Sequence, residues 1–481
     1  MEVYKLLYIN GEWVESETNR SFPVYNPANG EEIGEVADGN RNDTKKAIEA
    51  AAQSFKTWSK LTAYERSSYL YKAYQIMMER KEELARLMTI EQGKPLKASR
   101  NEVQYGADFL LWYAEEAKRV YGEIIPAQRR DQRFLAIRQP VGVIGAITPW
   151  NYPVSMITRK LAPALAAGCT VVLKPAEETP LCAKEVFKVL ADAGIPNGVI
   201  NLVSSANPEE IGEELLSNKA VKKITFTGST NVGKLLAEKA ARYVKRISME
   251  LGGHAPFIVY DDADPVHAAK GVSLVKFLNT GQACISPNRI FVHRSIAEEF
   301  TNTLIERVNK LRAGNGLEEG VSIGPLVNEA AIEKVDDQVK DAIERGASLK
   351  IGGNRMIENG LGKGNYYAPT ILSGINKEMK IFSEETFGPV APIIIFDSDE
   401  EVMEMANDTN YGLAAYVYTN NLSRAMRAFE ELNFGIIGIN DINPTSAAAP
   451  FGGMNESGLG REGGREGIEE YLETKLGGFS I

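Results

Sequence analysis

Residues 141–175, VGVIGAITPWNYPVSMITRKLAPALAAGCTVVLKP, decide the fold class of this chain. The runs VGVIGAIT and TVVLK are short, apolar and strand-like, and residues 153–167 between them have a helical pattern that stops at Gly168. Short apolar strands that alternate with helices are typical of a parallel sheet covered by helices on both faces. The stretch therefore predicts an α/β, doubly wound fold.

The alternation continues toward the C-terminus. Helices are predicted over 180–193, 208–217 and 230–243, with the strand-like runs VINLV and KKITF between them. After RISMELGG (246–253), a second alternating region covers roughly 250–440. Because such sheets bind ligands at the carboxyl ends of their strands, we expect functional residues in the loops that follow the strands.

The flanking segments have other patterns. Residues 43–118 read as helices, with Asp43 as the expected N-cap of the first. Residues 119–140 contain two β-like runs around a charged turn, which indicates a hairpin. The tail GIEEYLETKLGGFSI (467–481) ends in a strand-like run that could pair with this hairpin or with a neighbouring subunit.

Composition excludes several classes of protein. The chain has 481 residues, a length for which about three structural units are expected. Its net charge of −10 argues against a nucleic-acid surface, which needs clustered Lys and Arg. The start MEVYKLLYINGEW lacks a signal-peptide core, and no apolar run approaches the ~18 residues of a membrane helix. Cys169, Cys182 and Cys284 are too few and too scattered for a disulfide framework, so we predict a reduced, cytoplasmic protein without membrane or nucleic-acid partners.

Histidine chemistry is nearly excluded as well. The three histidines, His254, His267 and His293, do not pair at a metal-ligand spacing, and the chain has no CxxC. We therefore expect no metal site, and we expect a catalytic base among the carboxylates.

One cysteine has unusual neighbours. Residues 277–289, FLNTGQACISPNR, place Cys284 in a polar loop after an apolar helix. Gly281 lets this loop turn tightly, and Asn279 and Gln282 are expected to bond exposed backbone groups. Such a loop presents a thiol for reaction, whereas the other two cysteines are expected to pack in the core.

Two segments after strands suit a nucleotide, but each has a simpler alternative. Gly228, Ser229 and Gly233 lie where a strand turns into a helix, which suits a phosphate or a plain strand-to-helix turn. Lys174 and Glu177 follow another strand, where the carboxylate could accept ribose hydroxyls or the two side chains could form a solvated ion pair.

Two more segments suit catalysis. In TPWNYP (148–153), Asn151 could donate to an oxyanion, although its aromatic neighbours are more simply read as packing. In SMELGG (248–253), burial at a strand end would raise the pKa of Glu250 and make it a general base, unless it serves a structural ion pair.

Six segments together give a family resemblance. PWNYP, FTGSTNVG, MELGG, GQAC, EETFGPV and PFGGMNESGLGRE have the order and approximate spacing of the NAD(P)-dependent aldehyde dehydrogenase superfamily, which the chain resembles over its full length. The branch it resembles most is succinate-semialdehyde dehydrogenase-like, on the segments MITRKLAPALAAGC, ELGGHAPFIV and APFGGMNESGLGREGG.

The resemblance implies oxidation of an aldehyde to the carboxylic acid. On the family pattern, the Cys284 thiolate attacks the aldehyde to give a thiohemiacetal, while the Asn151 amide and the Cys284 backbone N–H hold the oxyanion. Loss of a hydride to the nicotinamide leaves a thioester. Glu250 then activates the water that releases the acid, and Lys160 assists the proton transfers.

The resemblance also implies the cofactor-binding residues. They are Thr148, Trp150, Lys174, Glu177, Gly228, Ser229, Gly233, Leu251, Glu385 and Phe387. Lys174 and Glu177 would meet the adenosine ribose, and Glu385 with Phe387 the nicotinamide ribose. Relatives that prefer NADP have a small residue at the Glu177 position, so we predict NAD as the preferred cofactor and NADP as the alternative.

The substrate prediction depends on two positions. Arg159 matches an arginine that grips the distal carboxylate in the branch. A second family arginine is Leu278 here, and the loss of one such contact costs about 1.5–3 kcal/mol. We predict a small carboxylate-bearing semialdehyde such as succinate semialdehyde, with lactaldehyde, glycolaldehyde or a broad range of aldehydes as alternatives. The branch's second cysteine is Ser286 here, so a local disulfide switch is not expected.

The resemblance further implies a three-part architecture. Residues 1–118 and 141–249 would form a dinucleotide-binding domain, and 250–440 a catalytic domain. Residues 119–140 and 441–481 would bridge subunits, because a projecting hairpin and a terminal strand leave unpaired edges in a monomer. A homodimer or homotetramer is therefore expected.

Two other functions remain as alternatives. A CoA-acylating relative would share the fold and the cysteine, but such enzymes usually lack the Glu250 base because CoA replaces water. A non-catalytic cofactor-binding structural protein predicts a damaged nucleophile or base, whereas Cys284 and Glu250 are both intact.

Overall fold

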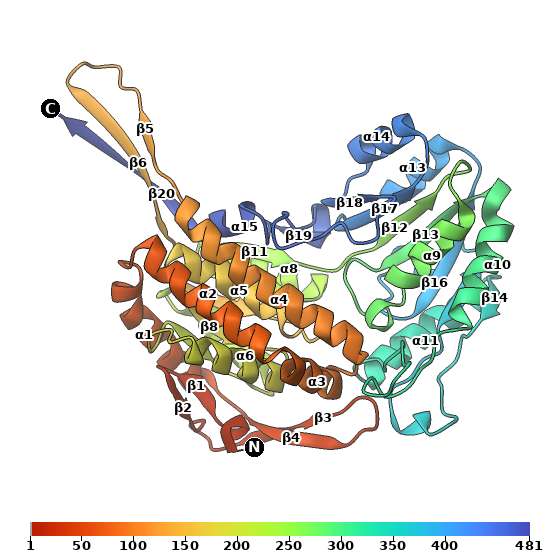
Figure 1. The fold of residues 1–481 in the computed structure, drawn as a ribbon, viewed down its shortest axis with the longest axis horizontal. Helices are drawn as coiled ribbons and strands as arrows, with labels where there is room; N and C mark the ends of the chain where they lie inside the picture. The colour runs from red at the N-terminus through yellow and green to blue at the C-terminus, as the bar shows by residue number, and fades with distance from the viewer. Residues whose placement is uncertain (1) are drawn as a thin grey trace.

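An eight-stranded sheet forms the centre of one lobe of the computed structural model, which describes residues 2–481 (Figure 1). The strand order is β19-β11-β10-β7-β8-β9-β1-β2, in which β11, β10, β7, β8 and β9 are parallel. The bounds are β1 Leu7–Ile9, β2 Glu12–Val14, β7 Val143–Ile147, β8 Thr170–Lys174, β9 Ile200–Leu202, β10 Val221–Thr227, β11 Arg246–Glu250 and β19 Gly458–Leu459. The strands expected from the alternating pattern are therefore confirmed.

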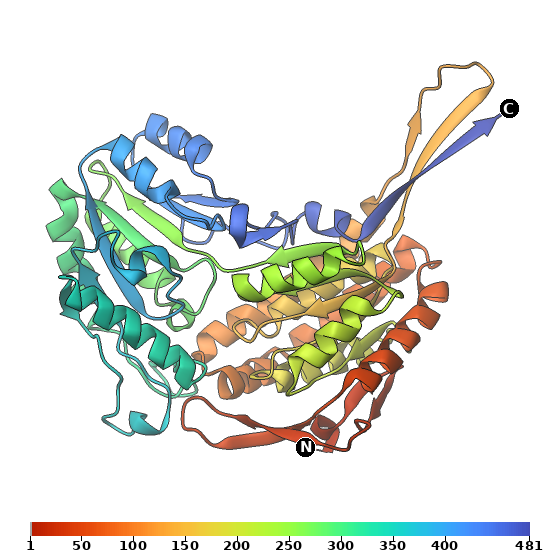
Figure 2. The ribbon, with the colours of Figure 1, turned by 180° about the vertical axis from the view of Figure 1, so that it is seen from behind.

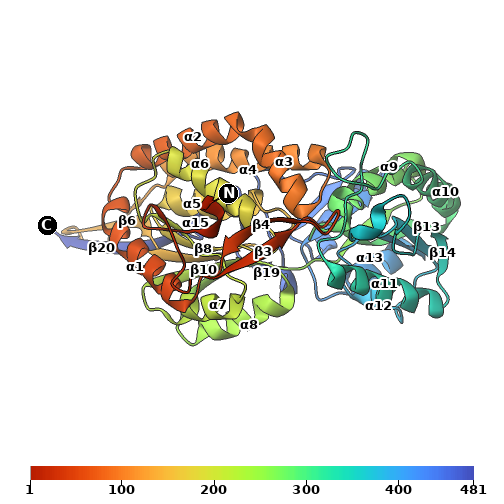
Figure 3. The same cartoon turned by 90° about the horizontal axis from the view of Figure 1, so that it is seen from below.

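Helices cover both faces of this first sheet. Their bounds are α1 Arg41–Trp58, α2 Ala63–Glu79, α3 Lys81–Gln92, α4 Leu96–Glu116, α5 Ser155–Ala167, α6 Pro180–Asp192, α7 Pro208–Ser217 and α8 Thr230–Ala241. Figure 3 shows α2 to α6 on one side of the sheet and α7 with α8 on the other, and each side has its own buried apolar cluster. The doubly wound arrangement is therefore confirmed, and α5 ends at Gly168 as predicted.

The predicted N-cap of the first helix was wrong by three residues. Asn40 is the N-cap of α1, and its side chain accepts from the Asp43 backbone N–H at 3.0 Å. The Asp43 carboxylate accepts in return from the Asn40 N–H at 3.1 Å. Asp43, at the third helical position, completes a capping box with Asn40. Because both residues have side chains that can cap a helix, the sequence pattern led to the choice of Asp43 as the N-cap.

A seven-stranded sheet forms the second lobe. Its order is β14-β15-β16-β13-β12-β17-β18, and only the β14–β15 pair is antiparallel among the described residues. The strands are β12 Ala255–Val259, β13 Pro287–His293, β14 Ser348–Ile351, β15 Thr370–Ser373, β16 Val390–Phe396, β17 Ala414–Tyr418 and β18 Ile436–Ile439. The helices are α9 Pro265–Val275, α10 Ala297–Val308, α11 Glu329–Glu344, α12 Lys380–Ser383, α13 Asp399–Asn407 and α14 Leu422–Glu431. Two buried apolar clusters again lie on the two faces.

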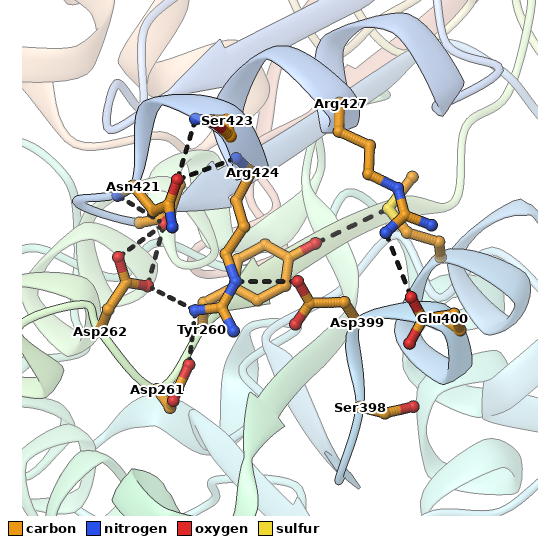
Figure 4. Close-up of polar contacts among 12 residues, drawn as sticks. Tyr260, Asp261, Asp262, Ser398, Asp399, Glu400, Asn421, Ser423, Arg424 and Arg427 are labelled. Carbon is orange, nitrogen blue, oxygen red and sulfur yellow. Dashed lines mark hydrogen bonds and ion pairs between the residues drawn. The ribbon is translucent and has the colours of Figure 1, made fainter.

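Arg424 fixes α14 to the second sheet (Figure 4). Its guanidinium pairs with Asp261 at 2.6 Å and with Asp399 at 2.8 Å, and it lies over the Tyr260 ring at 5.0 Å from the centroid. Because Asp261 follows β12 and Asp399 begins α13, one side chain joins three elements. Asn421 caps the same helix by accepting from the Arg424 backbone N–H at 3.3 Å.

A three-stranded arm projects from the first lobe (Figures 1 and 2). It consists of β5 Glu123–Ile125, β6 Gln132–Pro140 and β20 Leu472–Ser480, with β20 antiparallel to β6 along its full length. The predicted hairpin is confirmed, and the C-terminal strand pairs with it within the same chain. Exposed apolar side chains on these three strands are Ile124, Ile125, Leu135, Ile137, Leu476 and Phe479.

The remaining elements are short. They are the β3–β4 hairpin (Ser21–Tyr25 and Glu32–Ala37), α15 Glu466–Glu469, and 3₁₀ helices at Glu2–Lys5, Ala117–Arg119, Leu278–Gly281, Arg294–Ile296, Leu361–Lys363 and Asn455–Ser457. No helix between residues 2 and 481 has the length and apolarity that a bilayer span requires.

The chain crosses between the lobes at two places. Residues 251–254 lead from β11 into β12, and residues 440–457 return from β18 to β19. The returning strand β19 pairs with β11, with Gly458 opposite Glu250. The end of β11 is therefore held at the junction of the two sheets.

Candidate active site

The Cys284 loop turns sharply between α9 and β13. Gly281 has φ +77°, as the tight turn requires, but Asn279 and Thr280 also have left-handed values of +49° and +58°. A side chain on Gly281 would overlap the carbonyl oxygen of Gly388. The loop therefore packs backbone against backbone on the EETFGPV segment, with Gly281 against Gly388.

The polar side chains of this loop bond its backbone, as predicted. Asn279 donates to the carbonyl oxygens of Asn151 at 3.0 Å and Gln282 at 3.2 Å. Gln282 donates to the Pro325 carbonyl at 3.2 Å and accepts from the Val327 N–H at 2.9 Å. These bonds join the loop to the segment that carries Asn151.

Two cavities meet at Cys284. The tryptophan cavity, about 350 Å³, is lined by Trp150, Asn151 and Phe387 among others. The arginine cavity, about 460 Å³, is lined by Arg159 and by residues of α4, α9 and the chain after β18. Cys284 and Met156 line both cavities, so these two residues lie between them.

The tryptophan cavity contains most of the predicted cofactor residues. It is lined by Trp150, Gly228, Ser229, Leu251, Glu385 and Phe387. The Trp150 and Phe387 rings meet edge to face at 5.6 Å, and Phe387 has φ +54°. Glu385 accepts from the Gly253 N–H at 2.8 Å. Ser229 caps the N-terminus of α8, whose free N–H groups face this side.

Gly233 has a packing role in this structure. A side chain there would overlap Leu251, so the glycine lets α8 lie close to the chain that leaves β11. Gly228 likewise leaves room for the Phe226 ring. Sequence spacing alone does not separate such packing glycines from glycines that approach a phosphate.

Thr148, Lys174 and Glu177 lie further from Cys284. The Thr148 N–H donates to the Lys174 carbonyl at 3.2 Å, which continues the pairing of β7 and β8. Lys174 is buried and forms an ion pair with Glu177, whose side chain is 33% exposed. Glu177 lines a third cavity that shares Val327 and Asn328 with the tryptophan cavity. The tryptophan cavity therefore adjoins both of the others.

The arginine cavity has apolar walls and a charged end. Arg159 lies over the Phe451 ring at 4.2 Å from the centroid and pairs with Glu462 at 2.5 Å. Within the described chain, neither the Arg159 Nη2 nor the Tyr105 hydroxyl has a hydrogen-bond partner, although both are buried. Leu278 lines the same cavity and is partly exposed.

Glu462 joins both buried cations of α5. It bonds Lys160 with one oxygen and pairs with Arg159 through the other. The sequence reasoning missed this residue, because the GLGRE segment that contains it gives no indication of its partners. Lys94 and Glu102, which form a second buried ion pair, were also missed, because their own segments give no indication of this pairing.

Glu250 is buried at the end of β11. Burial raises its pKa well above the ordinary value, and the nearby charge of Glu462 raises it further, while Arg159, Lys160 and Arg461 oppose the shift. The direction predicted from a strand-end carboxylate is therefore found. No side chain or backbone group of residues 2–481 bonds its Oε2, which leaves that oxygen free for water or substrate.

The thiol of Cys284 is difficult to ionise in this setting. Burial raises its pKa to about 12, and the charges of Glu250 and Glu385 add to the shift that Arg159 opposes. Since the thiolate is the nucleophile, the sulfur needs a base to remove its proton. Cys169 and Cys182 are fully buried in the core, as predicted.

Comparisons with known proteins agree with these features. The model of the Aldehyde dehydrogenase family matches residues 13–476. A mitochondrial succinate-semialdehyde dehydrogenase of Oryza sativa subsp. japonica is 50% identical over 97% of this chain and 88% of its own length. A 3-sulfolactaldehyde dehydrogenase of Pseudomonas putida is 47% identical over 98% of this chain and 96% of its own. A crystal structure of an E. coli NADP-dependent enzyme superposes with a TM-score of 0.97 and 46% identity, covering 100% of this chain and 99% of the other.

The tight turn beside Cys284 can be tested with two alanine variants. Gly281 and Gly374 have nearly equal φ values, +77° and +74°, but only the Gly281 position is crowded. We expect Gly374→Ala to cost about 1–2 kcal/mol for the left-handed backbone alone. Gly281→Ala should lower the thermal unfolding temperature further, because the Gly388 backbone must move, as calorimetry of both variants will show. Equal unfolding temperatures would contradict the close contact.

Proposed function

This chain belongs to the aldehyde dehydrogenase family and is an NAD(P)-dependent enzyme that oxidises an aldehyde to the carboxylic acid, and we propose that Cys284 is the nucleophile of this reaction. The observation that carries the proposal is the place of its sulfur between two cavities. A group that must contact both an aldehyde and a hydride acceptor needs access to two binding sites, one for each.

The tryptophan cavity suits the nicotinamide half of the cofactor. Two buried hydroxyls that line it, those of Thr227 and Thr386, have no hydrogen-bond partner in residues 2–481, and the N-terminus of α8 suits a phosphate. We assign Trp150, Ser229, Glu385 and Phe387 to this half. When bound there, the cofactor takes up the hydride that leaves the aldehyde carbon.

The adenosine half fits the third cavity, where Glu177 and its neighbour Lys174 lie. Thr148 supports this part through its bond to the Lys174 backbone. Gly228, Gly233 and Leu251 shape the passage between the two halves by packing rather than by polar contact. The two adjoining cavities, which share Val327 and Asn328, support an elongated ligand such as a dinucleotide.

The first chemical step is addition of sulfur to the aldehyde. The Cys284 proton moves to a base as the C–S bond forms, and the carbonyl oxygen becomes an oxyanion. The Asn151 Nδ2 donates one of its two hydrogens to the Gln282 carbonyl at 3.1 Å, which leaves the other for this oxyanion beside the Cys284 N–H. Asn151 lines the tryptophan cavity with Cys284, which supports this role.

Glu250 is the base in the second step. After the hydride has left, its carboxylate takes a proton from a water that attacks the thioester carbon, and the C–S bond breaks to release the acid. Its raised pKa makes the carboxylate a stronger base than an ordinary glutamate. Lys160, which bonds Glu462 and acts on the charge of Glu250, would assist this proton movement.

We propose an aldehyde whose far end is an acid. The Arg159 guanidinium and the Tyr105 hydroxyl, which interact with each other, both line the arginine cavity and supply two donor groups for an acid there. The relatives described above are named for succinate semialdehyde and for 3-sulfolactaldehyde, which end in a carboxylate and a sulfonate. Because Glu462 already pairs with Arg159, the acid group of the substrate would bind an arginine whose charge is partly neutralised.

We propose NAD as the preferred cofactor because the Glu177 carboxylate would repel a 2′-phosphate. The similar E. coli structure is described as NADP-dependent. The cofactor preference proposed here therefore rests on Glu177 of this chain and not on that relative. The Lys174–Glu177 ion pair holds the carboxylate close to the cavity that it lines.

We also propose a homodimer or homotetramer that uses the arm, residues 119–140 with part of 441–481. The exposed apolar side chains of the arm and the free edges of β5 and β20 support this, since isolated edges and apolar patches favour association. Residues 1–118 with 141–249 would bind the dinucleotide, and 250–440 would supply the nucleophile.

The nucleophile and the base are tested by two variants. Cys284→Ser should lower kcat by at least about a thousandfold, because a hydroxyl is a much weaker nucleophile than a thiolate. Glu250→Gln should lower kcat about 100-fold or more. Reduction of the cofactor at the parent rate by Cys284→Ser would refute the mechanism.

The pH dependence of the parent enzyme gives a separate test of Glu250. The acid limb of its kcat pH profile should lie above pH ~4.3, the ordinary glutamate pKa, because only the deprotonated carboxylate is a base.

The acid-ended substrate is tested through Arg159. In Arg159→Met, the ratio of kcat/KM for succinic semialdehyde to that for butanal should fall by about 10–150-fold, the equivalent of one charge-assisted contact. The ratio is used because general damage to the site affects both aldehydes. Lactaldehyde and glycolaldehyde complete the panel, and a parent enzyme that prefers butanal would exclude the acid-ended substrate.

Cofactor preference is tested at Glu177. Glu177→Ser should raise the NADP-to-NAD ratio of kcat/KM at least about tenfold, since it removes a charge beside the ribose. Glu178→Ser, at the next residue along the same cavity, is the matched control and should change the ratio less. An unchanged ratio in Glu177→Ser would show that another residue selects the cofactor.

A further inference from the structure

A buried ion pair lies beside the segment that carries Asn151, where both of its residues also line the arginine cavity. Lys94 and Glu102 are 0% and 1% exposed, and their charged atoms are 2.5 Å apart. The Lys94 ammonium also donates to the Asn151 backbone carbonyl at 2.6 Å and lies over the Tyr152 ring at 4.1 Å from the centroid. Lys94 lies between α3 and α4, so these contacts join the outer helices to the candidate site.

The partner carboxylate holds the other end of the same segment. The second oxygen of Glu102 accepts from the backbone N–H groups of Val154 at 2.9 Å and Ser155 at 3.2 Å. These groups lie at the start of α5, where the first N–H groups have no partner within the helix. Together the pair fixes residues 151–155 at both ends, and this segment contains the amide proposed to bind the oxyanion.

Stability gives no sufficient reason for such a pair. Removing two charges from water costs several kcal/mol per ion, and apolar residues of similar volume often serve a core equally well. The specific contacts are made to the Asn151 carbonyl and to the Val154 N–H, backbone groups that closely follow the Asn151 side chain along the chain. On the opposite side, Asn279 of the Cys284 loop donates to the same carbonyl as Lys94. The Asn151 peptide is therefore held between two elements that come from different lobes.

We propose that Lys94, held by Glu102, is a positioning residue that sets the Asn151 amide at the distance an oxyanion requires. This inference rests on the function proposed above for Asn151 and Cys284. A donor is useful only where the oxyanion forms, and a displacement of about 1 Å can cost a hundredfold in rate. Lys94 acts through Asn151 and changes kcat more than KM, because substrate binding in the ground state does not need the oxyanion contact.

The test is a double-mutant cycle between Lys94→Met and Asn151→Ala, measured with NAD and a saturating aldehyde. Asn151→Ala should lower kcat about 100-fold to 1000-fold, and Lys94→Met about 10-fold to 100-fold with KM within threefold of the parent. The double variant should be no slower than Asn151→Ala alone, because a positioning residue has nothing left to position. Losses that multiply would overturn the proposal.

Two further variants separate positioning from folding. Lys94→Met/Glu102→Gln removes both charges but keeps an amide oxygen to accept from Val154 and Ser155, so it avoids an unpaired buried charge. It should fold and still show the reduced kcat. Lys184→Met is the matched control, because Lys184 is also fully buried, bonds the Leu6 carbonyl and faces the Trp13 ring. It should lose stability but keep kcat within threefold of the parent.

The outcomes distinguish this inference from the proposed function. A parent enzyme without activity on the aldehyde panel, or full activity in Cys284→Ser, removes the proposed function and the positioning role with it. A slow Asn151→Ala with normal kcat in Lys94→Met/Glu102→Gln keeps the function and overturns only the inference. A slow Lys184→Met with the same kcat loss as Lys94→Met would assign the effect to general destabilisation, which also overturns it.

Discussion

Glu462 is the charge on which the candidate site depends. It lies in the interior, where it forms ion pairs with both Arg159 and Lys160. Without this carboxylate, α5 would bring two unpaired cations into a region from which water is excluded, at a cost of several kcal/mol each. With it, both cations can act on the charge of Glu250, and Arg159 also acts on the thiol of Cys284.

Burial raises the pKa of both the Cys284 thiol and the Glu250 carboxyl group. The thiol is hard to ionise and the carboxylate of Glu250 is unusually basic, so a proton held by sulfur has a nearby acceptor. Burial is the main cause of both shifts. Burial at the junction of the two lobes therefore supports the acid–base roles proposed for Cys284 and Glu250.

The junction itself is made by backbone contacts. The Cys284 loop turns through three left-handed residues and lies against Gly388, while Asn279 bonds the Asn151 carbonyl across to the other lobe. The proposed nucleophile and oxyanion donor are thus fixed relative to one another by bonds to main-chain atoms. The residues proposed to select the substrate and the cofactor, Arg159 and Glu177, act through side chains that line the cavities.

The sequence by itself determined the fold class, the parallel strands from residue 141 to residue 250, the arm hairpin and the reactive setting of Cys284. These features follow from local patterns, because apolar periodicity and glycine placement act over a few residues. Glu462, Lys94 and Glu102 were decided only by the tertiary structure. Each is a charged residue that looks like a surface residue in its own segment, and its partners lie 8 to 303 positions away, from Lys94–Glu102 to Arg159–Glu462. Charge pairing over such separations depends on how the helices pack against the sheets, and a linear pattern does not contain that information.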